Sequence, residues 1–398
     1  MTTFTPTADE DVVASVQWAL AENAPLEIMG EGSKRGIGRP AQTEHAINLS
    51  ALSGITLYEP EELVLSARAG TPLAKIEELL KRNRQQLAFE PMDYGPLLEQ
   101  PAGRGTIGGV LAGNLAGPRR LKAGAARDHV LGVSVVSGRG ELFKSGGRVV
   151  KNVTGYDLSK VMAGSWGTLG VLTSLTFKVL PAPEMEATLL VRGLSEGDAA
   201  AAMALAMGSS AEVSSAAHLP EGISTPTLNV LLGSGPKTLL RLEGFGPSVA
   251  YRFDLLHRLL RDGGVIERID DSTAVWAEIR DCAPFADNTD RPVWRVSMAP
   301  SEAYKMVAEL RMHAGAAAFY DWQGGLVWLR MEAEPEAEGI RALVAHFGGG
   351  HATLVRASPS VRASTPVFQP QPPALAALSA RLKEQFDPNG ILNPGRMG

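Results

Sequence analysis

Three glycine-rich clusters in the first half of the chain carry residue types suited to holding a phosphorylated ligand. They are Gly30-Glu31-Gly32-Ser33-Lys34, Gly103 to Gly109, and Gly164 to Gly170. Glycine lets the backbone approach a ligand closely and adopt positive φ, and exposed backbone N–H groups bind phosphate oxygens. A tight turn explains any single glycine more simply. Three clusters between residues 30 and 170 nevertheless favour a shared diphosphate ligand.

The middle cluster also matches the G-x-G-x-x-G pattern of dinucleotide-binding Rossmann folds, through Gly103, Gly105 and Gly108. That pattern needs a buried strand directly before it and an acidic residue about 20 residues later, at the end of the next strand. Here Pro101 stands where strand donors are needed, and Asp128 comes before the next predicted strand instead of after it. A Rossmann fold is therefore disfavoured. Thr106 is expected instead to cap a helix that starts near Gly108.

The sequence around the clusters predicts short helices and strands. Thr71 and Pro72 open a predicted helix that continues to Asn83, and Gly138-Arg139-Gly140 forms the turn of a predicted hairpin. The predicted strands are 26–29, 63–68, 131–136, 141–144 and a run that ends at residue 180. Prolines 181 and 183 stop this run and indicate a domain boundary.

From residue 184 onward, Ala-rich helical segments alternate with strand-like runs. The predicted helices are 198–207, 249–260 and 302–313, and the predicted strands are 228–232, 238–243, 293–298 and 326–331. This order suits helices packed on one face of an antiparallel sheet. Residues 358–373 are rich in Pro and Ser and are expected to form a linker before a last helix, 374–386.

Composition excludes several functional classes. The net charge of −5 lacks the basic surplus of a nucleic-acid-binding protein. Cys282 is the only cysteine, which excludes a disulfide framework and a thiolate-bound iron–sulfur cluster. The polar, acidic start does not resemble a secretory signal, and no run approaches about 18 apolar residues. We expect a cytoplasmic protein, with peripheral association at the inner membrane through partner subunits as an alternative.

Five segments together resemble the PCMH-type FAD-binding flavoproteins of the vanillyl-alcohol oxidase superfamily. These segments are Gly30–Lys34, Arg104–Gly117, Gly147–Asp157, Gly164–Val171 and Asn393–Arg396. Within the superfamily, the chain is most similar to the FAD-binding E subunits of bacterial glycolate oxidases, from about residue 10 to the end and most densely over 101–181. The resemblance implies an α+β fold with three parts. These are a PCMH-type FAD-binding domain of two α+β subdomains (1–182), an α+β cap domain built on an antiparallel sheet (183–360), and a C-terminal segment that returns to the FAD domain (361–398).

The resemblance also implies a set of cofactor-binding residues. The first loop would bind the FAD diphosphate through backbone amides of Gly30, Gly32, Ser33 and Lys34. Diphosphate and flavin ring would be held by Thr106, Ile107, Gly108, Gly109, Gly113 and Asn114. The isoalloxazine or its supporting loop would involve Val150, Asn152, Thr154 and Gly155. The adenine side would involve Gly167, Gly170 and Val171, and the flavin edge Asn393 and Arg396.

Covalent attachment of the flavin is not expected. Many relatives tether the ring to a His or Cys near the second loop, but residues 101–117 contain neither. The chain also lacks the His-x-His pair of catalytic relatives, so no metal site is expected. The weak candidates for substrate contact are Arg295, which could clamp a carboxylate, Trp322 and His351. Packing is an equally simple role for Arg295 and the simpler one for Trp322.

By resemblance, the chain is the FAD-binding subunit of a glycolate oxidase complex, with a sister FAD subunit and an iron–sulfur subunit as partners. Such a complex would oxidise glycolate or a related 2-hydroxy acid to the 2-oxo acid by hydride transfer to flavin. Two alternatives stay open at this stage. One is a free-standing FAD-dependent dehydrogenase of another 2-hydroxy acid or alcohol, and the other is a non-catalytic assembly subunit with structural FAD.

Overall fold

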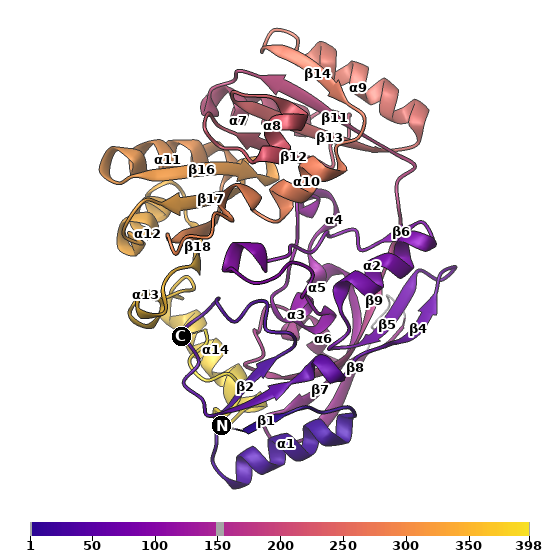
Figure 1. The fold of residues 1–398 in the computed structure, drawn as a ribbon, viewed down its shortest axis with the longest axis vertical. Helices are drawn as coiled ribbons and strands as arrows, with labels where there is room; N and C mark the ends of the chain where they lie inside the picture. The colour runs from indigo at the N-terminus through magenta and orange to yellow at the C-terminus, as the bar shows by residue number, and fades with distance from the viewer. Residues whose placement is uncertain (1, 149–154, 398) are drawn as a thin grey trace. The chain divides into compact units, whose positions relative to one another are not determined.

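The computed structural model describes residues 2–148 and 155–397, which form two compact units (Figure 1). Unit 1 comprises residues 1–116, 124–182 and 370–398, and unit 2 comprises residues 117–123 and 183–369. Each unit therefore contains a segment that is remote in sequence from the rest of it.

One part of unit 1 is a three-stranded parallel sheet in the order β1-β3-β2. Its strands are β1 (Thr2–Phe4), β2 (Leu26–Met29) and β3 (His45–Asn48). Helix α1 (Asp9–Ala21) lies beside this sheet (Figure 1) and buries Val12 and Val16 against Leu26 and Ile47. The C-terminal segment extends the same core, because Leu26 N–H donates to the Ile391 carbonyl at 2.7 Å.

The other part of unit 1 is a five-stranded antiparallel sheet in the order β4-β5-β9-β7-β8. Its strands are β4 (Ile55–Glu59), β5 (Val64–Arg68), β7 (Val130–Ser137), β8 (Leu142–Gly146) and β9 (Gly170–Lys178). The predicted hairpin is confirmed as β7 and β8, which pair from Val136 opposite Leu142. A separate two-stranded antiparallel sheet pairs β6 (Gln85–Gln86) with β10 (Leu180–Pro181).

Unit 2 is built on one eight-stranded antiparallel sheet in the order β14-β11-β13-β12-β16-β17-β15-β18. Its strands are β11 (Met185–Arg192), β12 (Ser215–Leu219), β13 (Lys237–Gly244), β14 (Val265–Ile269), β15 (Val293–Met298), β16 (Ala316–Asp321), β17 (Leu326–Met331) and β18 (Gly350–Arg356). Four helices cover one face and form its apolar core: α7 (Glu196–Met207), α9 (Gly246–Leu260), α11 (Pro300–His313) and α12 (Ala337–His346). The predicted antiparallel sheet is confirmed. Helices lie on both of its faces, however, because Trp276 of α10 (Thr273–Arg280) donates to the Thr188 hydroxyl at 2.8 Å on the face opposite these four helices.

Two local predictions in the second half are wrong. Residues 228–232 form part of helix α8 (Pro226–Leu232) instead of a strand, because the Thr225 hydroxyl accepts from Leu228 N–H at 3.1 Å and Pro226 fills the first helical turn. The expected linker contains helix α13 (Pro359–Ser364), capped by the Ser358 hydroxyl.

The remaining helices complete the two units. In unit 1 these are α2 (Leu73–Arg82), α3 (Ile107–Ala112), α5 (Ala126–His129), α6 (Leu158–Met162) and α14 (Pro373–Phe386), and in unit 2 α4 (Arg120–Ala123) and α10 (Thr273–Arg280). Single 3-10 turns occur at Leu49–Ala51, Pro96–Leu98, Ala283–Phe285 and Trp322–Gly324. No helix within the described residues is both long and apolar enough to cross a bilayer.

Candidate functional site

A pocket in unit 1 is lined by residues from all three glycine clusters. It encloses about 720 Å³ of space, counting its open mouth. Ten of the predicted cofactor residues line it: Gly30, Gly32, Ser33, Lys34, Thr106, Gly108, Gly109, Gly167, Gly170 and Arg396. Segments near the two ends of the chain, from Ile28 to Arg396, therefore share one cavity.

Small residues are required where the loop after β2 meets helix α3. A Cβ added to Gly30 would lie 2.5 Å from Thr106 Oγ1, and one added to Gly108 would lie 2.8 Å from the Ala69 carbonyl oxygen. A Cβ on Gly109 would meet Thr106 Oγ1 at 3.3 Å and the Lys34 ammonium at 3.2 Å. Gly30 and Gly108 must therefore be small because protein atoms pack directly against them, whereas the nearest atoms at Gly109 belong to the flexible Lys34 side chain. We call these three pocket-lining positions the glycine cradle, since glycine lets the backbone approach a neighbour closely.

Thr106 begins helix α3 as the sequence predicts. Its backbone is extended, and its hydroxyl accepts from Gly109 N–H at 3.4 Å. This hydrogen bond satisfies one of the first-turn donors that the helix itself leaves free. The cap fixes the end of α3 at the pocket wall.

The charged side chains at the pocket fall into two kinds. Arg35 donates to both carboxylate oxygens of Glu27, at 2.8 and 2.6 Å, and Arg104 pairs with Glu31 at 3.0 Å. Lys34 instead has the Ser33 hydroxyl, at 3.2 Å, as its hydrogen-bond partner. Burial lowers the pKa of Lys34 to about 8, with Asp93 opposing this change and Arg396 adding to it.

The C-terminal residues hold the third glycine cluster in place. Asn393 is buried, its Oδ1 accepts from Ile28 N–H at 2.7 Å, and its Nδ2 donates to the Trp166 carbonyl at 2.7 Å. Arg396 donates to the Lys34 carbonyl at 2.7 Å and its guanidinium lies 5.9 Å from the Trp166 ring. Asn393 thus acts on the pocket through Ile28 and Trp166, which line it, whereas Arg396 lines it directly.

Other predicted residues do not line the pocket. Ile107 and Val171 are fully buried in the protein core, Gly113 ends helix α3, and the Asn114 side chain accepts from Arg127 N–H. Gly155 has no neighbour within 4 Å of an added Cβ. Val150, Asn152 and Thr154 lie outside the described residues. Pocket residues that the sequence did not reveal are Ile28, Met29, Glu31, Arg35, Leu49, Ala69, Ala112, Trp166 and Leu172.

Two of the three candidates for substrate contact, Arg295 and His351, lie on the face of the unit 2 sheet opposite α7, α9, α11 and α12, and the third, Trp322, lies in the 3-10 turn after β16. On β15, Trp294 and Val296 enter the helix-covered core, so the alternating Arg295 faces the other way. His351 on β18 is exposed and lies opposite Ser297 of β15. Ser297 is two residues after Arg295 on the same strand, so His351 and Arg295 lie on the same face of the sheet. The Arg295 guanidinium stacks 4.9 Å from the Trp322 ring, while Trp322 Nε1 donates to the Gly117 carbonyl at 3.0 Å. Arg295 has no hydrogen-bond or ion-pair partner in the described part of the chain.

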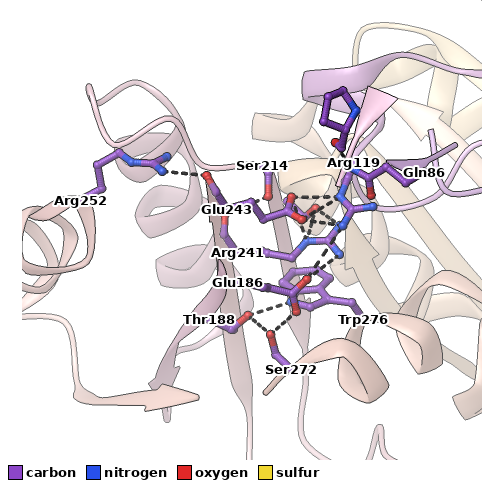
Figure 2. Close-up of polar contacts among 12 residues, drawn as sticks. Gln86, Arg119, Glu186, Thr188, Ser214, Arg241, Glu243, Arg252, Ser272 and Trp276 are labelled. Carbon is purple, nitrogen blue, oxygen red and sulfur yellow. Dashed lines mark hydrogen bonds and ion pairs between the residues drawn. The ribbon is translucent and has the colours of Figure 1, made fainter. Parts of the chain in front are cut away.

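The same face carries a cluster of buried charges that the sequence did not reveal (Figure 2). Arg119 donates to both oxygens of Glu243, and Arg241 lies within 3.8 Å of Glu243 and 3.7 Å of Glu186. Burial alone would raise the pKa of Glu243, but Arg241 and Arg119 lower it to about 2. Burial raises the pKa of Glu186, although Arg241 opposes this shift. The four charges balance, which is typical of a structural network.

Comparison with known proteins identifies FAD as the cofactor of this chain. Residues 2–146 match a family described as FAD binding domain. The glycine cradle and the cations Lys34 and Arg396 fit the diphosphate of this cofactor. The prediction of FAD is thereby confirmed. Absence of a covalent link remains a prediction, and none of the described pocket residues is Cys or His. No group of three His, Cys, Asp or Glu residues in the described ranges is arranged to hold a metal ion.

Two curated relatives extend over most of the chain. Glycolate oxidase subunit GlcE of Escherichia coli (strain K12) is 34% identical over 97% of this chain and 96% of its own length. Glycolate oxidase subunit GlcD of Bacillus subtilis (strain 168) is 28% identical over 73% of this chain and 68% of its own length.

A solved structure shares the fold at low sequence identity. Substrate-bound p-cresol methylhydroxylase is 16% identical, with a TM-score of 0.71 that covers 100% of this chain and 88% of the other. This similarity supports the fold alone. The near full-length similarity to GlcE shows the family as well: the chain belongs to the family of glycolate oxidase subunit GlcE.

Proposed function

We propose that this protein is the FAD-binding subunit of a glycolate oxidase complex, which oxidises glycolate or a related 2-hydroxy acid to the 2-oxo acid. The observation that carries this proposal is the 34% identity to GlcE across 97% of the chain, together with a pocket built from the predicted FAD loops. Bound FAD would supply a two-electron acceptor for the hydride of the substrate C–H bond. The partners in this proposal are a sister FAD subunit and an iron–sulfur subunit.

The residues of unit 1 would bind the cofactor, and those of unit 2 would bind the substrate. The loop after β2 and the first turn of α3 offer backbone N–H groups, the Thr106 hydroxyl and the Lys34 ammonium to the diphosphate. On unit 2, the Arg295 guanidinium matches the geometry of a substrate carboxylate, because it is already oriented by Trp322 and has no competing acid in the described residues.

Anaerobic reduction tests the proposed activity. The purified protein should be yellow, and glycolate should bleach the flavin absorption in the presence of the partner subunits. Bleaching by glycolate without partners would instead identify a free-standing dehydrogenase. A complex that assembles fully and oxidises glycolate equally well when this subunit has lost FAD would identify an assembly subunit and refute the proposal.

Arg295→Met provides the test of the substrate site. In the assembled complex we expect KM for glycolate to rise at least tenfold with FAD content unchanged, since a charged hydrogen bond contributes about 1.5–3 kcal/mol. Arg291→Met is the matched control, because Arg291 forms an exposed ion pair with Glu332 near the same strand. Equal KM values for the two variants would exclude Arg295 from substrate binding.

A further inference from the structure

We propose that the Lys34 side chain, and not only the backbone around it, binds the FAD diphosphate, and that this ammonium makes cofactor affinity depend on pH and on the phosphate groups. This inference rests on FAD as the cofactor and is independent of the identity of the substrate. Its test measures FAD binding and does not depend on the outcome of the glycolate experiments.

The first argument is position. Lys34 follows β2 and points across the pocket to helix α3, where its Cε and Nζ each lie 3.2 Å from the site of a Gly109 Cβ. The Thr106 hydroxyl lies 3.3 Å from the same site and 2.5 Å from the site of a Gly30 Cβ. The ammonium thus occupies the glycine cradle itself, together with a hydroxyl that can donate to an anion.

The second argument is the missing counter-charge. The Lys34 ammonium has one hydrogen-bond partner in the described residues, the neutral Ser33 hydroxyl, and no carboxylate within ion-pair distance. Asp93 favours the charged form from farther away, but its two oxygens already accept from Gly95 N–H and Gly103 N–H at 2.9 and 2.7 Å. Lys34 is partly buried. A cation withdrawn from water without a paired anion is costly, and an anionic ligand reduces that cost.

The third argument is that neighbouring charges do not supply this anion. Glu27 is engaged by Arg35, and Glu31 by Arg104, so both acids near the loop already have arginine partners. Arg396 is a second cation, whose guanidinium donates to the Lys34 carbonyl. The pocket therefore concentrates positive charge at Lys34 and Arg396, which is the complement of a diphosphate dianion.

The pH dependence follows from proton linkage. Burial lowers the pKa of Lys34 to about 8, with Asp93 opposing and Arg396 reinforcing the shift. A bound diphosphate favours the charged ammonium and raises this pKa. FAD binding must then take up a proton above about pH 8, and the Kd should rise up to tenfold per pH unit there. Below pH 8 the Kd should be nearly constant with respect to this group.

The experiment titrates apo-protein with FAD and with riboflavin, which lacks phosphate, and follows flavin fluorescence from pH 7 to 9.5. Lys34→Met should raise the Kd for FAD 10- to 100-fold at pH 7, change riboflavin binding less than twofold, and abolish the rise of the FAD Kd above pH 8. Lys81→Met is the matched control, because Lys81 lies exposed on α2 away from the pocket.

Calorimetry of the unmutated protein gives an independent readout that needs no variant to fold. Titration at pH 8.5–9 in two buffers of different protonation enthalpy should reveal proton uptake with FAD and none with riboflavin. Absence of uptake with FAD would overturn the proposal. So would a Lys34→Met protein that binds FAD normally, or one that loses FAD and riboflavin to the same extent.

Discussion

Asn393 joins three distant segments of unit 1, and replacing it should destabilise that unit and loosen the cofactor together. Its side chain accepts from Ile28 N–H and donates to the Trp166 carbonyl, both at 2.7 Å, and it is 3% exposed. Its backbone φ is +42°, so Asn393→Gly removes the side chain without adding the strain that alanine would bring.

The expected magnitude follows from the two hydrogen bonds. Asn393→Gly leaves one partly buried donor and one partly buried acceptor unpaired, and each costs about 1–3 kcal/mol. We expect the free energy of unfolding of unit 1 to fall by about 2–6 kcal/mol, toward the low end if water reaches the site. Because Ile28 and Trp166 line the pocket, the Kd for FAD should rise about tenfold, equivalent to about 1.4 kcal/mol.

Three measurements check this prediction: urea unfolding, FAD titration, and hydrogen exchange of a peptide that contains Ile28. The amide of Ile28 should lose protection in Asn393→Gly, since its acceptor is gone. Asn389→Gly is the matched control, because Asn389 is exposed in the same segment and forms no side-chain hydrogen bond within the described residues. The reasoning fails if the two variants unfold within about 0.5 kcal/mol of each other, or if Ile28 stays protected.

Three further predictions concern other parts of the chain. Gly109→Val should lose FAD and stay folded, because the valine side chain would contact the flexible Lys34 side chain and occupy the glycine cradle. Gly105→Val should keep FAD, because only Leu73, at 4.0 Å, lies near the added Cβ. Equal flavin content of the two variants, measured by absorbance, would contradict this prediction. Burial lowers the pKa of His218 to about 4, against about 6.5 in the unfolded chain. The free energy of unfolding should therefore be unaffected by this group above pH 6.5 and should fall by about 3 kcal/mol as the pH falls from 6.5 to 4, because only the unfolded chain takes up the proton there. His218→Gln should flatten this slope in acid-unfolding curves, and an unchanged slope would exclude it as the source. Arg119→Met should destabilise unit 2 by about 2–3 kcal/mol in urea, since a buried carboxylate loses its bidentate donor, and an unaffected midpoint would count against that estimate.

The sequence predicted correctly those elements whose conformation is determined by residues within the element or directly beside it. The Thr106 cap and strands β15 and β17 were predicted correctly because a capping residue and an apolar run determine them within a few positions. Residues 228–232 have a similar apolar run, and the signal that distinguishes a helix there is Thr225-Pro226, just upstream. A Thr-Pro pair directly before an apolar run therefore favours a helix over a strand.

The pocket lining was less predictable, because a motif includes both ligand-facing and core-facing residues. Ile107 lies inside a glycine-rich motif, yet its side chain turns into the core while Gly108 and Gly109 face the pocket. Leu49 and Ala69 lie in no motif, and Trp166 lies between the glycines of the third cluster. They reach the pocket through sheet pairing and turns between residues far apart in sequence, and such tertiary placement cannot be inferred from local spacing.

The discontinuity of unit 1 has a consequence for biosynthesis. Its last strand-like contacts, Leu26 with Ile391 and Asn393, are made by residues that leave the ribosome after the whole of unit 2 has been translated. The half of the protein that is synthesised first is therefore completed last. Cofactor capture should then be a post-translational event, and a nascent chain stalled before residue 390 should emerge without flavin even when unit 2 has already become resistant to protease.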